Sequence, residues 1–181
     1  ITSYTRDATK GEWQYSTNGS SWTTISSSIS AASSSLTFKS TDYLRFLPAA
    51  NWNGSAPTLT VALIDSSTTV TTNATVDVST RGGTTAYSSS TVTLSNTVNA
   101  VNDAPVASGS ATLTAIDEDT TNPSGATVSS LFSSNFSDST DTVSGGSSAN
   151  TLAGIAITSY TRDATKGEWQ YSTNGSSWTT I

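Results

Sequence analysis

The carboxylates of this chain are unevenly placed, and their placement suggests one kind of chemistry. No Lys or Arg lies between Arg81 and Arg162, yet this stretch holds six acids, namely Asp103, Asp117, Glu118, Asp119, Asp138 and Asp141. Acids without a nearby basic residue favour a bound cation. Calcium suits them because it takes about six to eight oxygen ligands in flexible geometry, whereas zinc is disfavoured because the chain has no His and no Cys. The alternative is that these acids lie on exposed loops and only keep the protein soluble.

A duplication dominates the organisation of the chain. Residues 1–25 read ITSYTRDATKGEWQYSTNGSSWTTI, and residues 157–181 repeat this string without a difference. The second copy begins 156 residues after the first, which predicts one full period of a tandem array and the start of the next. We expect 1–100 to be the C-terminal part of one repeat and 101–181 the N-terminal part of the next.

Catalysis finds little support in the residue types. Ser and Thr are abundant, but there is no His to activate them and no Cys to act as a nucleophile. Paired carboxylates can hydrolyse a glycoside, but such a site would recur in every copy of an array, which is unusual for an enzyme. We therefore expect no enzymatic activity.

Short alternating runs indicate an all-β chain. Trp13 and Tyr15 alternate with polar residues and lead into Asn18-Gly19, a favoured turn pair, before the chain resumes at Trp22, which predicts a hairpin. Further runs predict strands at 36–38, 43–47, 59–64, 70–78, 92–98, 111–116 and 152–157. Their spacing, with Ser, Gly, Asn and Asp between them, is typical of an immunoglobulin-like or cadherin-like antiparallel β-sandwich with one wet face.

Composition and charge restrict the partners. The chain has 36 Ser and 35 Thr among 181 residues, only 11% charged residues and a formal net charge of −6. This acidic balance disfavours nucleic acid and anionic membranes and favours cations. No stretch approaches the length of about 18 apolar residues that a membrane span needs, and we expect any targeting signal to lie outside these residues.

The sharpest boundary signal is Ala100-Val101-Asn102-Asp103-Ala104-Pro105, where an apolar run ends and a new strand series begins. Here the chain resembles the cadherin-like and immunoglobulin-like repeats of giant bacterial surface adhesins of the RTX type. The resemblance covers essentially the whole chain and is carried by VNDAPV at 101–106, AIDEDT at 115–120, LAGIAIT at 152–158, GEWQYSTNGSSW at 11–22 and 167–178, and YLRFLPAANWNG at 43–54.

The resemblance implies a secreted, cell-surface extender whose repeats are joined end to end and hold a distal domain away from the cell. That distal domain would contact a host or surface glycan or protein. The resemblance also implies Ca²⁺ at the joints, with Asn102 and Asp103 matching the family's Asn-Asp linker and Glu118 its acidic residue after the first strand. Asp117, Asp119 and Asp141 complete the predicted ligand set.

Exposed aromatics suggest an alternative function, a module that binds glycan or protein. Trp52 lies in a polar Asn-Trp-Asn-Gly turn and is the preferred surface contact, whereas Trp13 is better explained as core. Binding of ice or minerals through Thr-x-Thr strands is a third possibility, disfavoured because Thr is irregularly mixed with Ser and Asn.

The duplicated segment also predicts self-association. Its main packing partner lies either upstream, so that 157–181 completes a sandwich with 101–156, or downstream, so that 1–25 is the copy that packs. In both cases one copy lacks its partner, and we expect head-to-tail contacts between molecules.

Overall fold

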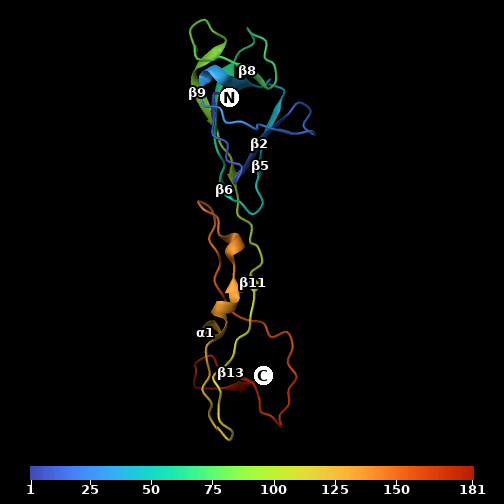
Figure 1. The fold of residues 1–181 in the computed structure, drawn as a ribbon, viewed down its shortest axis with the longest axis vertical. Helices are drawn as coiled ribbons and strands as arrows, with labels where there is room; N and C mark the ends of the chain where they lie inside the picture. The colour runs from blue at the N-terminus through green and yellow to red at the C-terminus, as the bar shows by residue number, and fades with distance from the viewer. The chain divides into compact units, whose positions relative to one another are not determined.

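A computed structural model describes all residues from 1 to 181, and it contains two compact units. Unit 1 comprises Ile1–Asp103 together with Thr140–Ala149, and unit 2 comprises Ala104–Ser139 together with Asn150–Ile181. Short strands in small antiparallel sheets make up most of the regular structure, and helix is limited to a few turns (Figure 1). The chain is thus built as an all-β fold requires. No helix is long and apolar enough to cross a membrane.

Unit 1 contains two three-stranded antiparallel sheets and two two-stranded pairs. The larger sheets have the strand orders β1-β7-β9 and β3-β2-β5, and the pairs are β10-β6 and β4-β8. The elements are β1 (Ser3–Tyr4), β2 (Gly11–Ser16), β3 (Thr23–Thr24), η1 (Ala32–Ser34), β4 (Ser35–Thr37), β5 (Tyr43–Pro48), β6 (Gly54–Ser55), β7 (Leu59–Ile64), β8 (Ala74–Val76), β9 (Tyr87–Leu94) and β10 (Thr97–Val98).

The core of unit 1 joins side chains from both larger sheets. Tyr4 and Leu59 are fully buried and lie opposite each other in the β1–β7 pair. Trp13 and Phe46 are cross-strand partners in β2 and β5, with their rings edge to face at 5.6 Å, and the Trp13 Nε1–H donates to the Pro57 carbonyl at 2.6 Å. Since large aliphatic residues are few, aromatic rings supply much of the apolar burial.

The predicted hairpin at residues 11–24 is confirmed, with a longer connection than a two-residue turn. Gln14 pairs with Thr24 and Tyr15 with Thr23, so residues 17–22 form the loop. The Asn18 side-chain oxygen accepts from the backbone N–H groups of Ser20 and Ser21 at 2.9 Å, which holds the loop in shape. The Asn-Gly pair therefore stabilises a wider loop in place of the tight turn that its residue types favour.

Unit 2 has few paired strands. Its elements are β11 (Val106–Ala107), α1 (Val128–Phe132), η2 (Ser133–Asn135), β12 (Phe136–Ser137), β13 (Gln170–Tyr171) and β14 (Thr179–Thr180), and η3 (Ser139–Asp141) begins at its edge. β11 pairs with β12, and β13 pairs with β14. The strands predicted at 111–116 and 152–157 are absent, so these two predictions were wrong. A run with strand composition forms a strand only when another strand offers its backbone groups.

The two copies of the duplicated segment lie in different surroundings. In the first copy, β1 pairs with β7 and β2 pairs with β5, so the copy packs against residues that follow it in the chain. In the second copy only the β13–β14 hairpin remains paired. Of the two arrangements considered from sequence, the structure shows the one in which 1–25 packs downstream.

Candidate functional site

The six acids of the basic-free stretch do not form one group. The structure contains no cluster of three or more carboxylates close enough to share a metal ion. It places Asp103 and Asp141 together in unit 1, Asp138 in unit 2, and Asp117, Glu118 and Asp119 on an exposed loop of unit 2. The acids must therefore be considered as three separate places.

The first place, in unit 1, is where the end of the segment Ile1–Asp103 meets the returning loop of residues 140–149. The backbone N–H of Asp103 donates to a carboxylate oxygen of the buried Asp141 at 2.9 Å. The neighbouring Asn102 is exposed, and its side-chain amide donates to the Asp103 carbonyl at 2.8 Å. Asp141 thus fixes the backbone at the Asn-Asp pair that the sequence singled out.

A second set of hydrogen bonds holds the returning loop, residues 140–149, onto unit 1. The Asn53 side-chain oxygen accepts from the Ser147 backbone N–H and its amide donates to the Ser147 hydroxyl, both at 2.8 Å. The Ser147 hydroxyl in turn donates to the Asp141 carbonyl at 2.5 Å. Gly146 lies so close to Asn53 that a side chain there would collide with it. Asn53, Ser147 and Asp141 therefore form one network around the Asp103 backbone.

Asp138 is the second place, and it carries an unpaired oxygen. Asp138 is 5% exposed, and one of its carboxylate oxygens accepts from the Asn150 backbone N–H at 2.6 Å. The other oxygen is buried with no hydrogen-bond partner. An unsatisfied buried acceptor on a charged group is costly, so a cation at this oxygen would relieve the cost.

The acidic loop of residues 117–119 is the third place, and it shows no such demand. All three residues are exposed, and the loop is closed by the Thr120 hydroxyl, which donates to the Asp117 carbonyl at 2.6 Å. Asp119 has a positive φ of 65°, a conformation that Asp tolerates in turns. Of the predicted ligands, Asp141 is buried among oxygen donors of the kind that suits Ca²⁺. Asp138, which was not among the predicted ligands, also offers an oxygen, one that has no partner.

Several other aspartates have a local structural use. Asp7, Asp65, Asp77 and Asp163 each accept from a hydroxyl and a backbone N–H two residues further on, at Thr9, Ser67, Ser79 and Thr165. These bonds, led by the one from the hydroxyl, lower the pKa of each carboxyl below its usual value of 3.8. These carboxylates stabilise turns.

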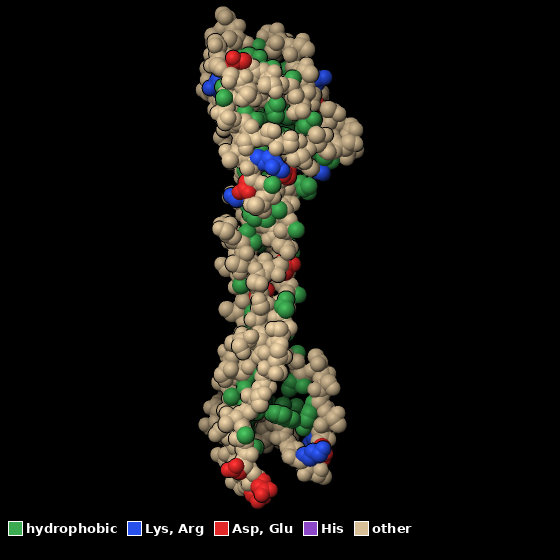
Figure 2. Space-filling view, viewed as in Figure 1, with side chains coloured by type: hydrophobic (Ala, Val, Ile, Leu, Met, Phe, Trp, Pro, Cys, Tyr) green, Lys and Arg blue, Asp and Glu red, His purple; other side chains and the backbone are tan.

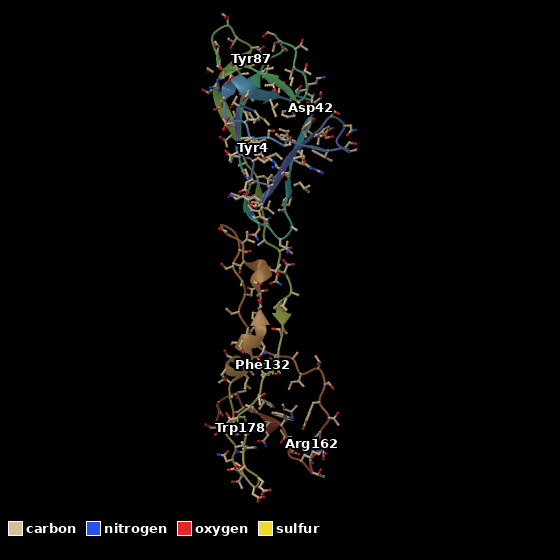
Figure 3. All side chains as sticks on the ribbon, viewed as in Figure 1. Tyr4, Asp42, Tyr87, Phe132, Arg162 and Trp178 are labelled. Carbon is tan, nitrogen blue, oxygen red and sulfur yellow. The ribbon has the colours of Figure 1, made fainter.

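The aromatic residues are mostly committed to packing. Trp52, the predicted surface contact, is half-buried, and its ring meets Phe46 edge to face at 6.0 Å. The Arg45 guanidinium lies 4.0 Å from the ring centre of Trp22, a cation–π contact. Tyr4 lies in the interior of unit 1 (Figure 3). Only part of the Trp52 ring is therefore offered to a partner.

Unit 2 contains a hollow of about 1200 Å³ between residues 113–125 and the second copy of the duplicated segment. Tyr160, Trp169 and Trp178 line it together with the acids of residues 117–119. Apolar side chains are visible around it (Figure 2), and Trp178 is labelled in Figure 3. Trp178 packs against Gly125 so closely that a side chain at this glycine would collide with the ring.

Sequence reasoning missed Asn53 and Ser147, the residues that hold the returning loop. They lie 94 positions apart, and no local pattern connects an Asn in one turn with a Ser in a distant loop. The glycines beside them, Gly54 and Gly145, both with positive φ, are the one signal that two turns meet closely. Comparison with protein-family models, with curated proteins and with solved structures finds no match for this chain.

Proposed function

We propose that this chain is a structural repeat of a large bacterial cell-surface adhesin, an extender that separates a distal ligand-binding domain from the cell. The observation that carries the proposal is the perfect 25-residue duplication at a spacing of 156 residues. Interchangeable copies suit a spacer, because only the number of copies sets its length. The two three-stranded antiparallel sheets of unit 1, joined by one apolar core, support an immunoglobulin-like or cadherin-like sandwich as the folded part of the repeat.

Under this proposal Ca²⁺ stiffens the joint that contains Asn102 and Asp103. At that joint the strongest donor is Asp141, whose carboxylate already accepts from the Asp103 backbone N–H. The unpaired oxygen of Asp138 in unit 2 is a separate candidate, and Asp117, Glu118 and Asp119 form a third, weaker one. Extracellular calcium modules bind in the range of about 10⁻⁴ to 10⁻³ M, which matches a secreted protein. Neighbouring repeats are then the main partners, and the chain has no catalytic role.

Small-angle scattering from chains of one, two and three periods tests the extender role. A spacer predicts a maximum dimension that rises by a constant increment with each added period. A compact particle whose dimension grows only with the cube root of mass would contradict it. Titration calorimetry with Ca²⁺, using Asp138→Asn as the matched variant, tests the metal: we expect millimolar or tighter binding that weakens in the variant.

A glycan-binding module is the second candidate, favoured by the hollow in unit 2, where Tyr160, Trp169 and Trp178 lie beside acidic side chains. Against it, Tyr4 and Trp13, the first-copy counterparts of Tyr160 and Trp169, are core residues of unit 1 with exposures of 1% and 2%. The same side chains are thus used for packing in the first copy, so their presence beside the hollow needs no ligand to explain it. Titration with a glycan panel separates the two functions, since an extender binds none of its members.

A further inference from the structure

Asn-Gly pairs in a protein can deamidate without an enzyme, and this chain contains three such pairs. The glycine backbone nitrogen loses its proton and attacks the Asn Cγ, so that an N–Cγ bond forms, the Cγ–Nδ2 bond breaks and ammonia leaves. Water then opens the resulting succinimide ring to Asp or to isoaspartate. Glycine favours the attack because it has no side chain to hinder the close approach of its backbone. The three pairs are Asn18-Gly19, Asn53-Gly54 and Asn174-Gly175.

In the first copy of the duplicated segment, a buried serine engages the groups that this reaction uses. The backbone N–H of Gly19 donates to the Ser16 hydroxyl at 2.9 Å, and the Ser16 hydroxyl donates to Asn18 Oδ1 at 3.0 Å. Asn18 Oδ1 also accepts from the backbone N–H groups of Ser20 and Ser21. Ser16 is 2% exposed, so little water reaches its hydroxyl. The attacking nitrogen and the amide under attack are therefore both held by hydrogen bonds.

The same bonds recur in the second copy. The backbone N–H of Gly175 donates to the Ser172 hydroxyl at 2.9 Å, and this hydroxyl donates to Asn174 Oδ1 at 3.1 Å. Asn174 Oδ1 again accepts two further backbone N–H groups, those of Ser176 and Ser177, at 2.8 Å. The two hairpins belong to different units, so the sequence of the hairpin is itself sufficient to set the arrangement.

These hydrogen bonds oppose closure of the ring. The glycine nitrogen enters the ring only after its proton has left, so the bond from the glycine N–H to the serine hydroxyl must break. Three donors fix the Asn Oδ1, and turning the Asn side chain toward the glycine nitrogen breaks those bonds as well. A hydrogen bond that is lost on the way to the transition state raises the barrier and slows the reaction.

We propose that the Ser16 hydroxyl, and the Ser172 hydroxyl in the second copy, protect the adjoining Asn-Gly pairs from deamidation. The opposite effect is chemically available, since donors to Oδ1 can stabilise the negative charge that develops on this oxygen, as an oxyanion hole does. These donors already bind Oδ1 before the reaction begins, whereas the bond from the glycine N–H is lost during it, so the net effect is protection. The inference does not depend on the extender function, and each can fail alone.

The pair Asn53-Gly54 provides an internal comparison. Asn53 is 8% exposed, and its side chain is held by the backbone N–H and the hydroxyl of Ser147, both at 2.8 Å. These bonds involve neither Ser16 nor Ser172. The deamidation rate of Asn53 should therefore stay unchanged when either of those hydroxyls is removed.

Full-length variants test the proposal by incubation at mildly alkaline pH, followed by digestion with trypsin and mass spectrometry. Ser16→Ala and Ser172→Ala each remove the protecting hydroxyl from one copy. Thr17→Ala and Thr173→Ala are the matched controls, because the Thr hydroxyls take no part in the bonds that hold the Asn-Gly pairs. Trypsin separates the three pairs, since Lys39 and Arg45 lie between the first two and Arg81 and Lys166 between the second and third.

We expect each serine variant to deamidate at least about fivefold faster at its own Asn-Gly pair, with the other pairs and the matched controls unchanged. Ser172→Thr keeps the hydroxyl and should deamidate at the rate of the unmodified chain. Unchanged rates in both serine variants overturn the proposal. A slower rate also overturns it, because the donors to Oδ1 would then act as an oxyanion hole. An equal rise at Asn53 contradicts it as well, because loss of the fold would then explain the rise.

Discussion

The substitutions Trp13→Ala and Trp169→Ala make the same chemical change at two places, and the structure predicts very different results. Trp13 is 2% exposed, contacts Phe46 and donates its Nε1–H to the Pro57 carbonyl. Removing a buried Trp side chain costs about 3–5 kcal/mol, and the Pro57 carbonyl loses its partner as well. Trp169 is 57% exposed, and a substitution at such a position changes stability by about 0.5 kcal/mol or less.

Differential scanning calorimetry in dilute solution measures this contrast, because dilution suppresses association between molecules. A unit of roughly 100 residues shifts its melting temperature by about 4–8 °C per kcal/mol. Trp13→Ala should therefore lower the unit 1 transition by more than about 10 °C, and Trp169→Ala should leave it in place. Similar shifts for the two variants would refute the conclusion that the first copy alone is packed.

Three further predictions follow from individual contacts. Gly11→Ala should destabilise unit 1 by about 1–3 kcal/mol in urea unfolding, because Gly11 has a φ of 137° and an added Cβ would collide with the Leu47 carbonyl; an unchanged midpoint would contradict the close β2–β5 approach. Asn53→Ala should speed amide hydrogen exchange in residues 140–149 by roughly ten- to a hundredfold, since the Ser147 N–H loses its acceptor, and unaltered exchange would show that the loop is held elsewhere. Acid should weaken unit 1 through Asp7, Asp65 and Asp77: their lowered pKa values mean that their stabilisation is present above 3.8 and is lost as the pH falls through the lowered values. Replacing all three by Asn should reduce the loss of stability between about pH 4 and pH 2, and an equal loss in the variant would disprove this origin.

The sequence predicted the strands of unit 1 well because their partners are present in the chain. The alternating runs at 43–47 and 59–64 became β5 and β7, which pair with β2 and β9. The run at 70–78 shortened to β8, and the run at 92–98 was divided between β9 and β10. Local pattern gives the residues that favour strand, and pairing decides where each strand begins and ends.

The failures in unit 2 have the same physical origin. Residues 111–116 alternate as a strand should, and residues 167–172 have the same sequence as the six residues of β2, yet the first forms no strand and the second only β13. In both cases the paired strand that would satisfy the backbone is missing from unit 2. Sequence pattern reports propensity and cannot report whether a partner is present.

The candidate site was predicted only in its residue types. Acid spacing identified Asp103, Asp138 and Asp141 as notable, and the structure gives the latter two buried carboxylates. Acid spacing could not show that the Asp141 carboxylate accepts from the Asp103 backbone N–H, or that Asn53 holds the loop of residues 140–149. These contacts span 38 and 94 positions. Contacts at such separation depend on the path of the whole chain.

Small-angle X-ray scattering on a two-period chain, first in millimolar calcium and then with excess chelator, tests the central claim most directly. Calcium-stiffened joints predict a larger maximum dimension and a stiffer particle in calcium, with the difference lost in a chain carrying Asp138→Asn and Asp141→Asn in each period. An identical profile in calcium and in chelator would contradict the account, because no calcium ion would then stiffen the joints.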